Sequence, residues 1–227
     1  MIRWLLAHPG PALDRGVFLC RQEVCEGKRF RHPGRHRQWL LGRAAAKTLL
    51  VKQAAADGGR DLPFRGIQVH RTPDGWPQPM AYGRVLPLSL SISHTGERAL
   101  CAVCPENEGL LGADIELVAA RPQSFMEDYY TQGERLRLAA LPAGTRDKLA
   151  TVIWCIKEAV LKARRTGFHE SATSVEVLAL DHFPTGVWKK AEAVLKDGTR
   201  PGTYWRLSED DSLAMAIAKI SAVTSLP

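Results

Sequence analysis

Long apolar segments are absent from this 227-residue chain. No apolar run approaches the roughly 20 residues that a helix needs to cross a bilayer. The short run at residues 2–7 lacks the length and the flanking residues of a secretory signal. We therefore expect a cytoplasmic protein with no membrane partner.

Cysteine is scarce as well. Five cysteines cannot all pair, and Cys101 and Cys104, spaced as C-x-x-C, have no second cysteine pair or nearby histidine to complete a zinc site. We expect all five to be reduced thiols, most of them buried.

The chain also lacks a low-complexity linker, a literal repeat and the G-x-S-x-G elbow of serine hydrolases. With 45% hydrophobic and 24% charged residues, the composition is typical of a soluble globular protein. Its length fits one large domain or two of about 110 residues, each able to bury its own core.

Positive charge is concentrated in the first quarter. Twelve Lys and Arg against four Asp and Glu give residues 1–60 a balance of +8, which leaves −1 for the rest of the chain. Such a field attracts nucleic acid, a phosphate-rich small molecule or an acidic protein, or it merely aids solubility. A nucleic-acid-binding module is disfavoured because no aromatics interleave the basic residues and no reading helix is recognisable.

A helix of roughly five turns is predicted at residues 145–163, which contain no proline or glycine. Glu158 and Lys162, four residues apart, share one of its faces. Taken alone, this pair is most simply a solvated surface ion pair.

A second acidic set closes the apolar run that begins at Leu110. Asp114 and Glu116 lie on the same face of a predicted strand because side chains alternate. With Glu158 they would supply three hard oxygen ligands suited to Mg²⁺ beside a phosphate. Without a partner the D-x-E pair would be a solvent-facing strand edge.

Ser91, Ser93 and His94 cluster at the end of another alternating strand, before Gly96. Small hydroxyls, an imidazole and a glycine that frees backbone amides suit an oxyanion such as phosphate. The alternative is a hydrogen-bonded surface histidine.

The remaining pattern places strands around one long helix in each half of the chain. Helices are predicted at residues 35–56, 122–130, 133–141 and 145–163, and strands at 2–7, 67–70, 88–96, 99–103, 110–116, 175–180, 187–194, 204–207 and 213–220.

Several segments together resemble the 4′-phosphopantetheinyl transferases. G-A-D-I-E at residues 112–116 and W-C-I-K-E-A-V-L-K at 154–162 are similar to the paired signature of that family. S-I-S-H-T-G at 91–96 lies where the family has its S-H-x-G turn, and H-R-Q-W-L-L-G at 36–42 resembles a segment of the surfactin-synthetase-activating type. The stretch with Tyr129, Tyr130 and Glu134 resembles an aromatic-x-x-x-E motif of the family. The ordered set spans roughly residues 30–170 and is far more specific than any one motif.

The resemblance implies an α+β monomer of two similar halves related by a pseudo-twofold axis. We expect an N-terminal half at residues 1–116 and a C-terminal half at 117–227, with coenzyme A in the cleft between them.

By the same likeness, Asp114, Glu116 and Glu158 would hold Mg²⁺ against the pyrophosphate of coenzyme A. Lys162 would contact the same phosphates, and Lys157 would lie beside it as a further cofactor contact.

Residues of the N-terminal half would bind the 3′-phosphate of coenzyme A. Arg37 and His94 would bind it, with Ser93 in the same turn and Arg43 on the same basic helix as Arg37. Trp76 stands between Gly75 and Pro77 where the family often has Lys or Arg, so one phosphate contact is expected to be missing.

The implied reaction is attack by a serine of an apo acyl or peptidyl carrier protein on the phosphorus that bears pantetheine, with release of 3′,5′-ADP. Glu158 is the expected base, while Asp114 and Lys162 complete the catalytic set. An acidic carrier would suit the basic first quarter. A Mg²⁺-dependent phosphohydrolase or nucleotidyltransferase would use the same acids and remains the alternative enzyme class.

Overall fold

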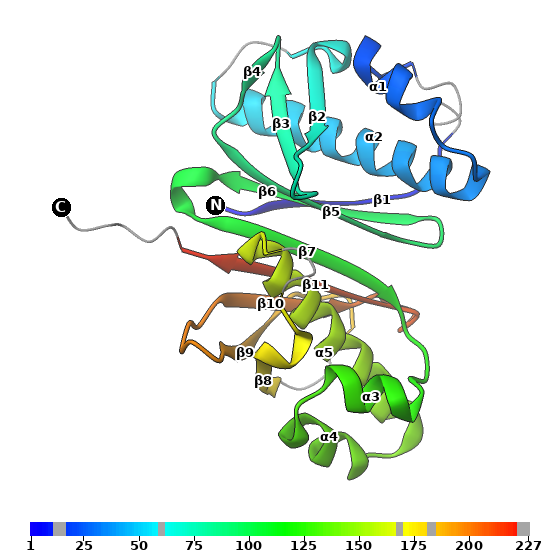
Figure 1. Ribbon diagram of the computed structural model, residues 1–227, viewed down its shortest axis with the longest axis vertical. Helices are drawn as coiled ribbons and strands as arrows, with labels where there is room; N and C mark the ends of the chain where they lie inside the picture. Colours follow the sequence, from blue (N-terminus) through cyan, green and yellow to red (C-terminus); the bar gives the residue numbers. More distant parts are fainter. Residues whose placement is uncertain (11–16, 59–61, 167–169, 181–184, 222–227) are drawn as a thin grey trace, which may run out of the picture. The chain divides into compact units, whose positions relative to one another are not determined.

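The computed structural model describes residues 1–10, 17–58, 62–166, 170–180 and 185–221. The chain divides into two compact units, Met1–Leu110 (unit 1) and Leu111–Pro227 (unit 2). Each unit combines β-sheet with one long helix, which confirms the predicted α+β class (Figure 1).

Unit 1 has two antiparallel three-stranded sheets. In the first, the strand order is β1 (Arg3–Ala7), β6 (Arg98–Pro105) and β5 (Leu88–Thr95). In the second, the order is β2 (Ile67–Arg71), β3 (Pro77–Ala81) and β4 (Arg84–Val85). Short 3₁₀ turns at Phe64–Gly66 (η1) and Glu106–Glu108 (η2) complete this unit.

Helix α2 (Pro33–Ala56) supplies much of the core of unit 1 and lies along the β1-β6-β5 sheet (Figure 1). It begins at Pro33 and is capped by His32, whose side chain accepts a hydrogen bond from the Arg35 amide. Its buried apolar residues recur at helical spacing, as the sequence predicts. They are Leu40, Leu41, Ala45, Ala46, Leu49 and Leu50.

Unit 2 is built on a five-stranded sheet. Its strand order is β7 (Leu110–Leu117), β11 (Leu213–Ile220), β10 (Gly202–Leu207), β9 (Lys189–Leu195) and β8 (Val175–Leu180). Helix α5 (Ala143–Arg164) packs on this sheet. Helices α3 (Gln123–Tyr129) and α4 (Gln132–Ala139) precede it, and a 3₁₀ turn at Ala172–Ser174 (η4) leads into β8.

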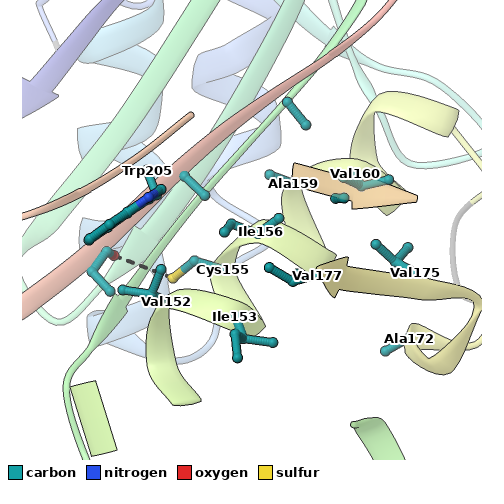
Figure 2. Close-up of a cluster of buried hydrophobic side chains, with 14 of the residues drawn as sticks. Val152, Ile153, Cys155, Ile156, Ala159, Val160, Ala172, Val175, Val177 and Trp205 are labelled. Atoms are coloured by element: carbon teal, nitrogen blue, oxygen red, sulfur yellow. Dashed lines mark hydrogen bonds between the residues drawn. The ribbon is translucent and has the colours of Figure 1, made fainter. Parts of the chain in front are cut away.

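The inward face of α5 forms the core of unit 2. Val152, Ile156, Ala159 and Ala163, the stripe that helical spacing puts on one side, are all fully buried. Figure 2 shows part of this cluster, where α5 faces β8 and Trp205 of β10, and where the Cys155 thiol donates a hydrogen bond to the carbonyl of Ala214.

The long helices and most strands agree with the sequence prediction. Helix α1 (Arg21–Gly27), β3 and β4 were not predicted, because α1 is rich in charge and the other two are short segments around prolines and a turn. None of the five cysteines forms a disulfide and four are buried, as expected. Within the described ranges, no helix has both the length and the apolar character needed to cross a membrane.

The boundary between the units falls six residues before the predicted one at residue 116. Strand β7 pairs with β11, so its hydrogen bonds tie Asp114 and Glu116 to unit 2. The pseudo-twofold relation between the halves stays a prediction.

Candidate active site

Gly112 brings strand β7 and helix α5 into direct backbone contact. A Cβ atom added to Gly112 would lie 1.8 Å from the carbonyl oxygen of Ala159 and 2.6 Å from the amide nitrogen of Ala163. No side chain tolerates such distances, so only glycine fits where this strand crosses the helix. The residues that follow Gly112 along β7 therefore lie beside the last turns of α5.

Asp114 and Lys162 form an ion pair at this crossing. Lys162 Nζ lies 2.6 Å from Asp114 Oδ1 and also donates to the carbonyl of Ala113 at 3.3 Å. The Asp114 side chain is 4% exposed and that of Lys162 is 33% exposed. Burial lowers the pKa of Lys162, but the Asp114 carboxylate outweighs it and the net pKa is raised. Lys162 is therefore a stable cation that still reaches solvent.

Glu116 lies two residues further along β7, on the same face as Asp114. Its Oε1 accepts a hydrogen bond of 3.3 Å from Trp154 Nε1, and its Oε2 is 3.9 Å from Arg121 Nη2. Burial raises the pKa of Glu116, and the charge of Asp114 raises it further against the opposing effect of Arg121.

The pKa of Glu158, which lies on α5, is affected by the same neighbouring charges. Burial raises its pKa, Lys162 lowers it, and the carboxylates of Asp114 and Glu116 raise it again, with a net upward shift. The three acids that the sequence predicts as one set therefore repel one another across the β7–α5 crossing. A cation placed among them would relieve that repulsion.

The side chains of these acids are not gathered as a ligand set. Across the described part of the chain, no three His, Cys, Asp or Glu side chains are grouped closely enough to hold a metal ion. Asp114 is turned toward Lys162, and Glu116 toward Trp154 and Arg121. The donor chemistry nevertheless fits a hard divalent cation, which prefers carboxylate oxygens.

An aromatic cluster supports Glu116. The Trp154 ring packs edge-on against Phe125 at 4.9 Å and Tyr129 at 5.2 Å between centroids. Arg121 lies over the Phe125 ring at 5.2 Å. Both partners of Glu116 are therefore held by rings from α3.

Lys157 corrects one expectation. Its side chain is 0% exposed and its Nζ lies 2.8 Å from Glu134 Oε2 on α4. It also donates to the carbonyls of Ala172 and Val175. A lysine enclosed in this way does not fit the predicted contact with coenzyme A, because its ammonium group is buried and already bonded to partners inside unit 2.

Unit 1 holds a cavity of about 510 Å³ with a basic lining. Its residues come from α1 and the segment that follows it, from α2, from β5, and from the β2–β3 hairpin with its turn. The lining includes Glu26, Phe30, Arg35, Gln38, Trp39, Gly42, Arg43, Arg71, Gly75, Pro77, Ile92 and His94.

Arg43 is the most enclosed arginine of this cavity, with 8% of the residue exposed. Its guanidinium lies 5.1 Å from the Trp39 ring centre, 3.9 Å from Glu23 and 3.8 Å from Glu26. Burial lowers its pKa and the two carboxylates raise it, with a net downward shift from a value so high that the charge remains.

The other residues predicted to bind coenzyme A in unit 1 lie partly at the cavity and partly outside it. His94 lines the cavity, and Ser93 is buried beside it on β5. Arg37 lies outside the lining, with half of its side chain exposed and its Nη1 3.7 Å from Glu97. The structure therefore brings Arg43 and His94 together and leaves Arg37 at the surface.

Arg35 and Arg71 also line the cavity, although no sequence motif points to either of them. Arg71 ends β2 and passes beside the turn at Gly75, with its Nη2 3.7 Å from the position of a Cβ there. It thus supplies a cation beside the turn that precedes Trp76. Its alignment with the turn depends on the β2–β3 register, which the sequence pattern does not give.

A second cavity, of about 530 Å³, lies among α3, α4 and α5 in unit 2. Three arginines and one acid line it together with apolar residues. The lining comprises Ala120, Arg121, Gln123, Met126, Gln132, Arg135, Leu136, Leu138, Ala139, Arg146, Asp147 and Ala150. Arg121 links this cavity to Glu116.

Comparison with known proteins finds one family that this part of the chain resembles. The model of the 4′-phosphopantetheinyl transferase superfamily matches residues 110–218, which include β7 and α5. The protein slr0495 of Synechocystis sp., assigned to the 4′-phosphopantetheinyl transferases, is 26% identical over 89% of this chain and 83% of its own length. The 4′-phosphopantetheinyl transferase HetI of Nostoc sp. is 27% identical over 68% of this chain and 62% of its own.

Two solved structures are more distant. The holo-[acyl-carrier-protein] synthase of Thermotoga maritima has a TM-score of 0.37 and 23% identity over 49% of this chain and 63% of its own. That of Bacillus anthracis, solved in complex with CoA (3′,5′-ADP), has a TM-score of 0.39 and 23% identity over 49% of this chain and 93% of its own. Residues 110–218, close to half of the chain, match the 4′-phosphopantetheinyl transferase superfamily, and they include the β7 and α5 residues of the candidate site.

Proposed function

We propose that this protein transfers the 4′-phosphopantetheine group of coenzyme A to a serine of an apo acyl or peptidyl carrier protein, with Mg²⁺, and releases 3′,5′-ADP. The observation that carries the proposal is the Asp114–Lys162 pair at the β7–α5 crossing, with Glu116 and Glu158 in its electrostatic field. All four residues lie within the segment that matches the family.

Asp114, Glu116 and Glu158 would hold Mg²⁺. When bound, the ion supplies positive charge that offsets the charge of the diphosphate during transfer. Burial is the largest cause of the raised pKa values of Glu116 and Glu158, and the neighbouring carboxylates add to it. That repulsion supports this role, because carboxylates that repel one another gain from a shared cation.

Lys162 and Glu158 have separate tasks in this proposal. Lys162 keeps its charge and a third of its surface in solvent, so it can contact the pyrophosphate oxygens. Glu158 would accept the proton of the carrier serine, directly or through a water.

The basic cavity of unit 1 suits the 3′-phosphate of coenzyme A. Arg35, Arg43, Arg71 and His94 converge on it and provide guanidinium and imidazole donors. Arg43 is held by Glu23, Glu26 and Trp39, so its fork is oriented before the ligand arrives.

We further propose that the acidic carrier protein docks at the arginine-lined cavity of unit 2. Arg121, Arg135 and Arg146 outnumber Asp147 there. Because Arg121 also neighbours Glu116, a carrier seated at this cavity would have its serine near the acids. The basic first quarter of the chain stays the alternative docking surface.

The test is transfer onto a panel of purified apo carrier proteins, followed by intact mass. The wild-type protein with coenzyme A and Mg²⁺ should add one 4′-phosphopantetheine, and Asp114→Ala and Glu158→Ala should abolish the gain. Activity that survives either change would refute the assigned site. A Mg²⁺-dependent phosphohydrolase would instead consume coenzyme A without a carrier, so silence in that control removes the alternative.

A further inference from the structure

The two units contain the same buried ion pair, built from corresponding elements. In unit 1, Lys47 of α2 lies 2.5 Å from Glu23 of α1, and their side chains are 0% and 1% exposed. In unit 2, Lys157 of α5 lies 2.8 Å from Glu134 of α4, and both side chains are 0% exposed. The amino-acid sequence shows no literal repeat, so this correspondence emerges only in three dimensions.

In unit 1 the carboxylate joins two segments through their backbones. Glu23 is the third residue of α1, and its Oε2 accepts a hydrogen bond of 3.0 Å from the N-cap amide of Cys20. Its Oε1 accepts one of 3.1 Å from the amide of Val69, the third residue of β2.

In unit 2 the same positions recur. Glu134 is the third residue of α4, and its Oε2 accepts a hydrogen bond of 2.8 Å from the N-cap amide of Thr131. Its Oε1 accepts one of 2.8 Å from the amide of Val177, the third residue of β8.

The lysines also have matching partners. Lys47 donates at 3.0 Å to the carbonyl of Phe64, the first residue of the turn η1 that leads into β2. Lys157 donates at 3.0 Å to the carbonyl of Ala172, the first residue of the turn η4 that leads into β8. Each pair therefore ties a short helix, a long helix and the following turn and strand to one another.

A buried ion pair adds little net stability because desolvation offsets the attraction, but it disfavours other arrangements of the same elements. Here each pair also satisfies several backbone groups, which fixes the rotation and the axial position of the long helix. Its presence in both units indicates that helix placement matters in both.

The two long helices carry different groups on the placed segment. On α5, Glu158 follows Lys157 directly and Lys162 lies just beyond one further turn, where it meets Asp114. On α2, Arg43 lies one turn before Lys47 and lines the cavity of unit 1.

We propose that each of the two buried ion pairs positions the long helix of its unit, and that the two pairs serve different steps of the reaction. This inference rests on the proposed function. Glu134–Lys157 sets α5 so that Lys162 meets Asp114 and Glu158 lies in the same electrostatic field, and therefore serves the transfer step. Glu23–Lys47 sets α2 so that Arg43 faces its cavity, and therefore serves the binding of coenzyme A.

The test compares two double variants, Glu134→Gln with Lys157→Met and Glu23→Gln with Lys47→Met. Replacing both partners avoids leaving one buried charge unpaired. The unit 2 variant should lower kcat about 10-fold or more, while the Kd for 3′,5′-ADP, which lacks the pyrophosphate that Lys162 would contact, stays nearly unchanged. The unit 1 variant should raise the KM for coenzyme A and the Kd for 3′,5′-ADP by about 10-fold with a nearly unchanged kcat.

The split between kcat and KM separates positioning from a general loss of stability. Equal changes in both parameters for both variants, or no change in either, would overturn the inference. If a double variant does not fold, Glu134→Asp and Glu23→Asp, which shorten the carboxylates by one methylene, should show the same split in milder form, and its absence there counts against the inference.

A failure of the proposed function can be told apart from a failure of this inference. A wild-type protein that modifies no carrier refutes the transfer, and calorimetric titrations with 3′,5′-ADP and Mn²⁺ then test the pairs without turnover. The unit 1 variant should weaken only nucleotide binding and the unit 2 variant only metal binding. Wild-type protein that binds neither ligand would overturn the inference as well.

Discussion

Replacement of Gly112 by alanine tests the crossing on which the candidate active site is built. The added Cβ would lie 1.8 Å from the Ala159 carbonyl oxygen, whereas ordinary contact begins near 3.4 Å. The strand must therefore move from the helix by roughly 1.6 Å, because the obstructing atoms are backbone and cannot rotate away. A shift of that size would stretch the 2.6 Å contact between Lys162 and Asp114 beyond hydrogen-bond distance.

Two magnitudes follow for Gly112→Ala. Overpacking of this kind costs about 1–3 kcal/mol or more, which lowers the Tm of a chain of this size by roughly 2–4 °C per kcal/mol. Misplacement of catalytic groups by about 1 Å lowers kcat/KM by roughly 100-fold. We expect both losses, measured by differential scanning fluorimetry and by the carrier-modification assay.

Gly144→Ala is the matched control. Gly144 lies in the first turn of α5 and an added Cβ there meets nothing within 4 Å. The change should leave activity intact and stabilise the protein by about 0.4–1 kcal/mol. If Gly112→Ala behaves like Gly144→Ala, β7 does not pack on α5 as described and the argument for the site is wrong.

Three further predictions concern charge. Because the pKa values of Glu116 and Glu158 are raised, the metal-free folded state holds their protons more tightly than the unfolded state, so their effect on stability should become less favourable as pH rises above about 4.5. Mg²⁺ should therefore raise Tm more at pH 8 than at pH 5, and Glu158→Gln should stabilise the metal-free protein at pH 8 while abolishing transfer; a Tm unaffected by Mg²⁺ at pH 8 would contradict this. Arg43→Leu should weaken 3′,5′-ADP binding by about 10-fold in calorimetry, and Arg37→Leu, outside the cavity, by much less; the reverse order would reject the unit 1 cavity as the phosphate site. Arg135→Glu with Arg146→Glu should raise the KM for the carrier about 10-fold with an unchanged KM for coenzyme A, and an unaltered carrier KM would exclude docking at the unit 2 cavity.

Periodicity predicted the parts of the fold in which burial follows a regular pattern. The apolar stripe of α5 and the alternation around Asp114 leave Lys162 and Asp114 on the surfaces where the structure pairs them, because one surface of each element is buried. The same reasoning fails for Lys157, since a charged residue beside a polar face reads as exposed until its buried partner Glu134 is known.

Long-range register accounts for most of what the sequence did not predict. Arg71 reaches the cavity of unit 1 only because β2 and β3 pair with Arg71 opposite Pro77. Strand β7 belongs to unit 2 because it pairs with β11, about a hundred residues later in the chain. Such pairings depend on contacts between distant segments, which a single sequence does not display.

The most direct test of phosphopantetheine transfer is the stoichiometry of its two products. Purified protein is incubated with coenzyme A, Mg²⁺ and an apo carrier, and 3′,5′-ADP is quantified by chromatography while the modified carrier is quantified by intact mass. We expect one 3′,5′-ADP for each modified carrier, and neither product after chelation of the metal or with Asp114→Ala. Release of 3′,5′-ADP without modification of any carrier, or modification that persists in Asp114→Ala, would contradict the proposed reaction.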